Sequence, residues 1–348
     1  MEVGIVGLPG VGKSTLFQAL TGQVVEAFAE KTNVGMANVP DPRLGRIAEY
    51  VTTRKVIPAT LKLVDIPGVP VGGDTKKLNR FLEQIRQVDA ICHVVRCFDP
   101  GTGAPAPASD IEKMETELVL ADLVVAESAR EKATRNARSG EREAKERLAL
   151  LEKLVTHLEE GKAVATETEW TDAEAALIRS YGLITAKPIV YVANVAEEAD
   201  PAVADAVSKH ADAVGSVAVP LCARLEAELA ELDEADRGEM LESLGLAEPA
   251  IGPLARAAHR VLGLTTFYTA GDKEVRAWTI PLGAVAPEAA GAIHSDIQRG
   301  FIRAECYGVD DLFELHSEKA IREAGRLRSE GKHYEMQEGD VVHFLFNV

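Results

Sequence analysis

The chain of 348 residues carries 38 Lys and Arg against 55 Asp and Glu, a formal net charge of −17. This acidity excludes a protein that coats nucleic acid without regard to sequence, because such binding needs many cations against the phosphates. There is no apolar run long enough for a membrane span, and the four cysteines show no paired metal-binding spacing. We therefore expect a cytoplasmic protein with no membrane partner, no zinc site and no disulfide framework.

The first hundred residues alternate short apolar runs with one amphipathic pattern. Residues 3–6, 60–64 and 90–95 have the composition of buried strands, and apolar side chains recur at helical spacing over 78–88. This alternation is typical of an α/β domain built on a parallel sheet. The stretch that follows, 99–110, is rich in Pro and Gly, which predicts that it lies outside helix and strand interiors.

A long, charged, proline-free stretch from 111 to 160 predicts two packed helices. Apolar and small side chains step through it by alternating three and four residues, the spacing of a helix–helix seam. They are Leu118, Ala121, Val125 and Ser128, then Leu148, Leu151, Val155 and Leu158. Ser139 and Gly140 lie between the two series and predict the turn of an antiparallel hairpin.

The tip of this hairpin is the basic part of an acidic chain. Residues 130–147 hold seven Lys and Arg against four Glu, a net of 7 − 4 = +3. Two interpretations fit this composition equally. It is either a solvated pair of helix ends or a contact with RNA phosphates.

Buried-strand composition returns at 188–193 and 216–219, which indicates that the hairpin is inserted into a single α/β domain. An acidic helical stretch over 226–248 is interpreted as a solvated helix face. From Leu264 the pattern changes to a small α+β module, with strands at 275–280 and 341–346 and a helix near 287–298. We place the domain boundaries as follows: 1–108 with 185–263 for the α/β domain, 109–184 for the helical insertion, and 264–348 for the C-terminal module.

Residues 7–14, GLPGVGKS, match the phosphate-binding pattern G-x-x-x-x-G-K-[ST] between a strand and a helix. Glycines in such a loop let backbone N–H groups surround phosphates, and the helix that follows directs its positive end toward them. We expect Lys13 to reach the β- and γ-phosphates and Ser14 to bind Mg²⁺. The expected nucleotide contacts in this loop are Gly7, Pro9, Gly10, Val11, Gly12, Lys13, Ser14 and Thr15.

Two further strand ends complete the predicted site. Asp65 and Gly68 belong to a D-x-x-G pattern after the second strand, where the Asp can hold Mg²⁺ through water and the Gly can donate to a γ-phosphate. Asn194 and Glu197 follow the 188–193 strand, where guanine-specific enzymes of this class carry N-K-x-D. Since Val195 replaces the Lys and Glu197 the Asp, these residues leave the choice between adenine and guanine open.

Taken in order, these motifs resemble the YchF-type branch of the Obg-like GTPases, also called Obg-like ATPases. The resemblance rests on GLPGVGKS, DIPG, HVVRCF, the helical insertion, NVAE, VPLCA and the C-terminal EVRAWTIP…GKHYEMQEGDVVHFLFNV. It implies a Ras-like G domain with a coiled-coil insertion and a C-terminal TGS domain of β-grasp shape. It also implies slow hydrolysis, association with ribosomes and a preference for ATP over GTP. That preference is attached to Asn194 and Glu197, with Cys222 and Ala223 near the purine.

This sequence departs from the family pattern at positions that serve hydrolysis. Gly10 stands where the family carries Asn, and the first switch segment is shortened, which leaves Thr32 as the nearest candidate for its Mg²⁺ ligand. Val69 occupies the place of the water-orienting Gln of Ras-like enzymes, and residues 99–110 contain no His. His93 precedes that loop and is interpreted as a core residue. We therefore expect slow turnover, with Lys13 and Gly68 as the catalytic contributors.

The sequence thus predicts a monomeric, Mg²⁺-dependent nucleotide hydrolase that prefers ATP and acts as a slow switch on the ribosome, with contact through 130–147. Two alternatives remain. One is a nucleotide-gated module that binds ribosomes or RNA with little hydrolysis. The other is a GTPase whose Asn194 and Glu197 recognise guanine.

Overall fold

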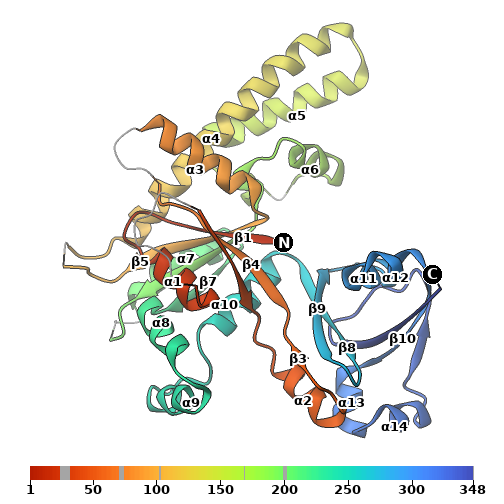
Figure 1. The fold of residues 1–348 in the computed structure, drawn as a ribbon. Helices are drawn as coiled ribbons and strands as arrows, with labels where there is room; N and C mark the ends of the chain where they lie inside the picture. The colour runs from red at the N-terminus through yellow and green to blue at the C-terminus, as the bar shows by residue number, and fades with distance from the viewer. Residues whose placement is uncertain (24–31, 70–73, 102, 168, 199–201, 348) are drawn as a thin grey trace. The chain divides into compact units, whose positions relative to one another are not determined.

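The structure is a computed structural model that describes residues 1–23, 32–69, 74–101, 103–167, 169–198 and 202–347 (Figure 1). The chain forms two compact units. The first consists of Met1–Met36 and Lys62–Val261, and the second of Ala37–Leu61 and Leu262–Val348. None of the described helices is both long and apolar enough to cross a membrane.

The first unit is built on a six-stranded sheet in the order β2-β4-β1-β5-β6-β7. Its strands are β1 Glu2–Val6, β2 Asn33–Asn38, β4 Thr60–Asp65, β5 Ala90–Cys97, β6 Ile189–Val195 and β7 Val217–Leu221. From β4 through β1, β5 and β6 to β7 every pairing is parallel, as predicted. The carboxyl ends of these five strands therefore meet at one edge, which is where α/β sheets hold their ligands.

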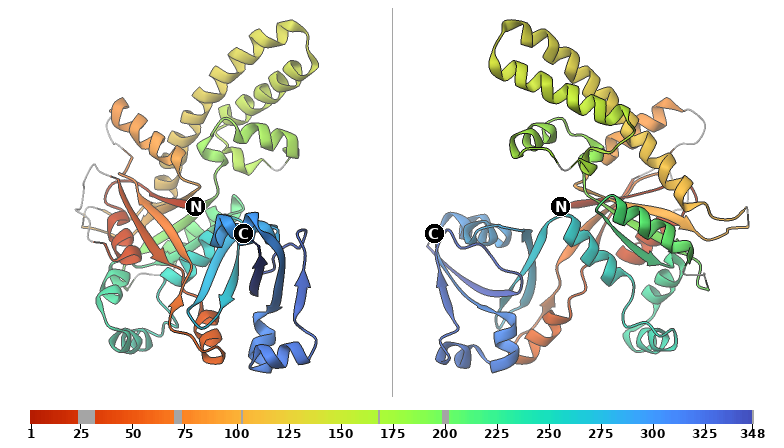
Figure 2. Two further views of the ribbon diagram at one scale, coloured as in Figure 1. Left: turned by 45° about the vertical axis from the view of Figure 1, so that its right-hand side comes forward. Right: turned by 180° about the vertical axis from the view of Figure 1, so that it is seen from behind.

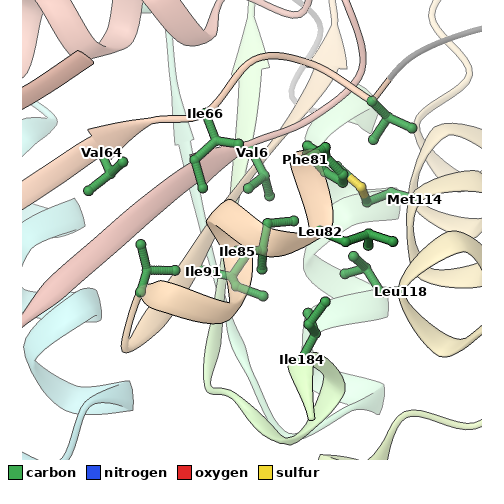
Figure 3. Packing of buried hydrophobic residues seen from close by; sticks show 12 residues of the cluster. Val6, Val64, Ile66, Phe81, Leu82, Ile85, Ile91, Met114, Leu118 and Ile184 are labelled. Atoms are coloured by element: carbon green, nitrogen blue, oxygen red, sulfur yellow. The ribbon is translucent and has the colours of Figure 1, made fainter. Parts of the chain in front are cut away.

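Helices surround this sheet. They are α1 Lys13–Thr21, α3 Thr75–Gln87, α4 Pro107–Asn136, α5 Arg142–Glu159, α6 Asp172–Arg179, α7 Ala202–Ala213, α8 Ala223–Glu231, α9 Glu234–Ser243 and α10 Ile251–Val261. Of these, α1, α3, α4 and α5 lie where the sequence predicts helices, whereas α6, α7 and α10 were not predicted. Side chains from β1, α3 and α4 pack in one core cluster, with Val6, Phe81, Ile85 and Met114 fully or almost fully buried (Figure 3).

In the first unit one predicted boundary is wrong, and one predicted helical stretch is divided in two. Residues 99–110 are not all loop, because α4 begins at Pro107, where the missing N–H of proline costs no hydrogen bond. The acidic stretch 226–248 is two helices, α8 and α9, because Asp233 interrupts it and accepts a 3.0 Å hydrogen bond from the N–H of Asp236 as the N-cap of α9.

The predicted helical hairpin is present, with α4 and α5 side by side in both views (Figure 2). The turn lies at the predicted place, since Gly140 has the left-handed φ of 83° that ends the short 3₁₀ segment Ala137–Ser139. The seam of α5 is as predicted. On α4 the prediction is wrong for three residues: Leu118 and Ala121 pack in the core cluster beside α3, and Ser128 is exposed. Buried seam positions on α4 are instead Val119, Ala126 and Ala133.

A buried carboxylate fastens α4 to the segment that returns to the sheet. Asp122 is fully buried and accepts hydrogen bonds from the backbone N–H groups of Ile184 and Thr185, at 2.9 and 2.7 Å, and from the Thr185 hydroxyl at 2.8 Å. These donors satisfy the amino end of the 3₁₀ turn Ile184–Ala186. The base of the hairpin is thereby held by side-chain hydrogen bonds as well as by apolar packing.

The second unit contains another six-stranded sheet, in the order β11-β10-β12-β8-β9-β3. Its strands are β3 Val56–Ile57, β8 Leu264–Ala270, β9 Val275–Pro281, β10 Phe301–Gly308, β11 Arg328–Glu330 and β12 Asp340–Phe346. Its helices are α2 Pro42–Tyr50, α11 Ala286–Ile293, α12 Ser295–Arg299, α13 Val309–Leu315 and α14 Glu318–Glu323. The helix predicted near 287–298 is two, α11 and α12, because His294 breaks it in an extended conformation.

Residues 37–61 differ from the sequence-based domain assignment, which gives them to the α/β domain. They form α2 and β3 and join the C-terminal residues in the second unit. The reason is local pairing: β3 lies parallel to β9 with Val56 opposite Val275, and the Val275 N–H donates to the Lys55 carbonyl at 2.9 Å. The strands β2 and β4 of the first sheet are therefore joined by a segment that folds as part of the second unit.

Candidate functional site

The predicted phosphate loop lies between β1 and α1, at the carboxyl edge of the first sheet. A Cβ on Gly7 would lie 2.5 Å from the Val94 carbonyl oxygen, and one on Gly12 would lie 2.3 Å from Nδ2 of Asn194. Gly12 also has a φ of 92°. Glycine is therefore required at both positions. Gly12 is the N-cap of α1 and makes no side-chain hydrogen bond. The first backbone N–H groups of α1 are therefore available to a phosphate bound in this loop.

Lys13 is buried inside the loop that it belongs to. Its Nζ donates to the carbonyl oxygens of Gly7, at 3.2 Å, and Leu8, at 2.9 Å. Burial lowers the pKa of Lys13 to about 8, against the opposing effect of the Asp65 carboxylate. A cation held in this way gains from an anionic ligand, because the phosphate replaces the neutral carbonyls as its partner.

Asp65 and Ser14 come together as the sequence predicts. The Ser14 hydroxyl donates to Oδ2 of Asp65 at 3.3 Å, and Asp65 itself is buried. Burial raises the pKa of Asp65 above its usual range, and the neighbouring Asn33, Lys13 and Ser14 act in the opposite direction. A divalent cation at this place would favour the ionised carboxylate.

Gly68 lies against the phosphate loop. A Cβ at Gly68 would be 3.0 Å from Nζ of Lys13 and 3.1 Å from the backbone nitrogen of Pro9. The D-x-x-G segment thus contacts the phosphate loop, and the two are predicted to bind the same nucleotide. A larger residue at position 68 would crowd both Lys13 and Pro9.

The structure joins the predicted Mg²⁺ ligand Thr32 to helix α3. Its hydroxyl accepts a short hydrogen bond from the side-chain amide of Gln84 on α3. The neighbouring Asn33 instead reaches the site, with its Nδ2 3.4 Å from Oδ2 of Asp65. Sequence reasoning missed Asn33. The only available signal was its place beside Thr32 at the start of an alternating segment.

Asn194 ties three parts of the site together. Its Nδ2 donates to the Val11 carbonyl oxygen at 2.8 Å, and its Oδ1 accepts from the Ala223 N–H at 2.9 Å. All three residues are buried. The end of β6 is thereby joined to the phosphate loop and to the start of α8, beside the half-buried Cys222. The side chain of Glu197 is exposed three residues further on.

Other predicted loop residues lie on the surface. Pro9, Gly10 and Thr15 are exposed, and Gly10 has a φ of 77° with open space around it. This left-handed conformation suits Gly and Asn alike, and with Gly10 the site has no side chain at this position. His93 is buried next to the Tyr191 ring, as expected of a core residue, and burial lowers its pKa to about 3.

The available oxygen donors fit Mg²⁺. The hydroxyl of Ser14 and the carboxylate of Asp65 are hard ligands of the kind this ion prefers, and it usually takes only one or two protein ligands together with phosphate oxygens and water. Within the described residues there is no group of three His, Cys, Asp or Glu that could hold a metal by itself. The site therefore suits an ion that arrives with a nucleotide.

Comparisons with known proteins agree with this geometry. Residues 2–127 match a family profile described as a 50S ribosome-binding GTPase, and residues 264–347 match the C-terminal profile of YchF GTPases, described as a protein of unknown function. The chain is 44% identical over 362 residues to the ribosome-binding ATPase YchF of Escherichia coli O157:H7, covering 100% of this chain and 99% of that protein. It is 41% identical over 369 residues to the protein of the same name from Bacillus subtilis, with 100% of each covered.

Solved structures show the same likeness. The YchF GTPase of Schizosaccharomyces pombe aligns with a TM-score of 0.87 at 30% identity, covering 99% of this chain and 97% of that one. A GTP binding protein from Pyrococcus horikoshii aligns with a TM-score of 0.59 at 21% identity over the whole of both chains, which shows a shared fold.

Proposed function

We propose a function from the family to which the chain belongs, the YchF family of P-loop nucleotide hydrolases. The protein hydrolyses ATP in preference to GTP, and it does so slowly and with Mg²⁺. The reaction serves as a switch on the ribosome. The observation that carries the proposal is the convergence of Lys13, Ser14, Asp65 and Gly68 around one loop at the carboxyl edge of the sheet. These four residues supply a phosphate-binding cation, two Mg²⁺ donors and a backbone N–H for the γ-phosphate.

In this proposal each residue has a distinct task. Lys13 leaves the carbonyls of Gly7 and Leu8 and binds the β- and γ-phosphates. Ser14 would hold Mg²⁺ directly and Asp65 through water, and the ion would supply positive charge against the transferred phosphoryl group. The Gly68 N–H fixes the γ-phosphate for attack by water. Turnover is slow because Val69 cannot orient that water and Gly10 brings no side chain to the phosphates.

The preference for ATP rests on the residues that follow β6. Recognition of guanine requires a carboxylate that accepts from two base N–H groups, a geometry that a short Asp provides next to the base. Here the nearest carboxylate is the longer, exposed Glu197, and Val195 replaces the lysine of the guanine-specific pattern. Asn194 keeps its structural bonds to Val11 and Ala223 with either base.

Association with the ribosome is supported by the names of the bacterial relatives and by the hairpin tip. The basic side chains of 130–147 are exposed, apart from the half-exposed Arg130. Arg142 is 92% exposed and pairs with Glu146 at 2.7 Å on the same helix. Such surface pairs contribute little stability, so these cations remain available for RNA phosphates. A cytoplasmic monomer bound to ribosomes through this tip is our working proposal.

We expect isothermal titration calorimetry with Mg²⁺ to show ATP binding at least about tenfold more tightly than GTP, a difference of about 1.4 kcal/mol. The double variant Val195→Lys with Glu197→Asp restores the guanine-specific pattern and should shift the preference toward GTP. Glu198→Asp changes a neighbouring exposed carboxylate in the same way and should leave the preference unchanged. A tenfold preference of the unmodified protein for GTP would contradict the proposal and favour the guanine-specific alternative.

Phosphate release under multiple turnover should be slow for the isolated protein and faster with ribosomes. A cation supplied by a partner can raise such rates by about 10³-fold or more, because it stabilises charge in the transition state. The measurement follows inorganic phosphate with ATP in excess, with and without purified ribosomes. If no phosphate appears in either condition, the protein is a nucleotide-gated binding module and not a hydrolase.

A further inference from the structure

A cavity of about 400 Å³ lies at the amino edge of the first sheet, the edge opposite the phosphate loop. It is lined by Ile189 and Tyr191 at the start of β6 and by Gly215 and Ser216 just before β7. The strand β6 is seven residues long, about 20 Å, and Asn194 of the nucleotide site lies near its other end. The cavity is therefore separate from the nucleotide site.

The remaining walls of the cavity come from the base of the helical hairpin, within the same compact unit. Helix α4 contributes Glu115, Leu118 and Val119, and further lining residues come from the turn 161–166 and the segment 185–188. Mainly apolar walls with a few convergent polar groups, around a volume of about 300–1,000 Å³, are the usual form of a small-molecule site. The cavity has this form and this size.

The carboxylate of Glu115 has one oxygen engaged and one to spare. Its Oε1 accepts from the Tyr191 hydroxyl at 2.5 Å, and Nε2 of His210 lies 2.8 Å from the same atom. Burial, and then the Glu115 carboxylate, raise the pKa of Tyr191, so its hydroxyl stays protonated and continues to donate. Among the residues that the structure describes, none bonds to Oε2 of Glu115, which can therefore accept from a ligand.

The two lysines that line the cavity already have partners for their ammonium groups. Nζ of Lys187 donates to the carbonyl oxygen of Arg86 at 3.1 Å, and makes a short hydrogen bond to that of Val88, both at the carboxyl end of α3. Nζ of Lys162 lies 2.7 Å from Oε2 of Glu160. Both positive charges are thus directed to groups of the protein itself.

The charges around the cavity favour a positively charged ligand. The buried Asp122 carboxylate lies directly behind the lining, since it accepts from the hydroxyl of Thr185 at 2.8 Å. Three carboxylates, those of Glu115, Asp122 and Glu160, therefore stand against the two paired lysines. Charge complementarity across a binding surface selects the ligand of opposite sign.

We propose that this cavity binds a small organic cation, an apolar ring compound with a primary ammonium group. The ring packs against apolar side chains such as Leu118 and Ile189, and the ammonium donates to Oε2 of Glu115. This site lies at the opposite edge of the sheet from the proposed nucleotide function and does not depend on it. Because the ligand contacts α4, β6 and the loop before β7 together, its binding should raise the melting temperature of the protein.

The test compares two probes that share an indole ring and a two-carbon chain and differ in the charge at its end. Tryptamine carries an ammonium group and indole-3-propionate a carboxylate. Titrations followed by saturation-transfer NMR on the full-length protein measure the affinity of each. Tryptamine should bind at least about tenfold more tightly than indole-3-propionate, because a hydrogen bond between charged groups accounts for a difference of this size.

Two variants locate the binding. Glu115→Gln keeps an oxygen that accepts from Tyr191 but removes the charge, so it should weaken tryptamine binding by about tenfold. Glu112→Gln, an exposed carboxylate on the same helix outside the cavity, is its control. Ala165→Trp places a large side chain at an exposed position of the lining and should abolish tryptamine binding, whereas Ala173→Trp on α6 should not.

The outcomes that overturn the proposal are distinct. Equal affinity for the two probes, tighter binding of the acid, or full tryptamine affinity in Glu115→Gln overturns the assignment of a cationic ligand. Tryptamine binding that survives in Ala165→Trp overturns its location. No tryptamine binding at millimolar concentrations overturns the site itself. If Glu115→Gln does not fold, the two probes on the unmodified protein and on Ala165→Trp still decide between these outcomes.

Discussion

Lys13→Ala should abolish measurable binding of both ATP and GTP. In the free protein the Lys13 ammonium is buried and bonded to two loop carbonyls. Phosphates provide the negative charge that such a buried cation lacks, and hydrogen bonds between charged groups contribute about 1.5–3 kcal/mol each. With two phosphates expected at Lys13, the affinity should fall by about 100-fold or more. Calorimetry with Mg²⁺ and each nucleotide measures the loss.

The matched control is Lys62→Ala in the neighbouring strand. Nζ of Lys62 lies 2.5 Å from Oε1 of Glu2, but both side chains are more than one-third exposed, so this pair should not affect nucleotide affinity. Thermal melting of the nucleotide-free Lys13→Ala protein should be no lower than that of the unmodified protein, because the cost of burying the Lys13 charge exceeds what the Asp65 carboxylate returns. Retained affinity in a folded Lys13→Ala protein would disprove the phosphate site.

Asn194→Ala should both destabilise the protein and weaken nucleotide binding. It leaves the buried Val11 carbonyl and the buried Ala223 N–H without the partner that each has now. An unsatisfied buried group costs about 1–3 kcal/mol, so the loss for two groups should be about 2–6 kcal/mol. Urea unfolding followed by circular dichroism measures the loss of stability, and calorimetry should show nucleotide affinity reduced by about tenfold or more as the loop loosens.

A second variant at position 194 separates the two bonds of Asn194. Asn194→Asp keeps an acceptor for the Ala223 N–H but sets a carboxylate oxygen against the Val11 carbonyl, so it should weaken the phosphate loop and preserve the start of α8. Asn79→Ala, an exposed asparagine on α3, is the control and should change neither measurement. Full nucleotide affinity in Asn194→Ala would show that the loop holds its shape without this side chain.

Much of the first unit could be predicted because its helices, strands and turns depend on residues that are close together in the sequence. The strands, the phosphate loop and the hairpin turn each follow from neighbouring residues, such as the apolar run of β5 or the positive φ that suits Gly140. The site could be assembled for the same reason, since parallel strands bring Ser14, Asp65 and Asn194 to one edge of the sheet.

The errors occur where one segment has distant or multiple partners. Helix α4 packs on α3 through residues such as Leu118 and on α5 through residues such as Val119. It therefore carries two apolar stripes, and a single heptad pattern cannot describe both. The partner of Asp41 is Tyr268, 227 residues away, and no periodicity in 37–61 indicates this pairing. Whether Thr32 or Asn33 reaches Asp65 depends on a strand register that spacing alone does not give.

The discontinuous second unit also imposes an order of events during synthesis. A ribosome adds about 5–20 residues per second, so Tyr268 follows Asp41 by about 10–45 s. Throughout this interval α2 has no C-terminal residues on which to bury Leu44 and Ile47. The earlier part of the chain can collapse in the meantime, but its β2 and β4 strands stay linked by an unpacked segment with exposed apolar side chains. A nascent chain stalled before residue 264 should therefore be a target for chaperones or proteases. Residues 264–348 complete the fold of a segment, 37–61, that is synthesised well before them.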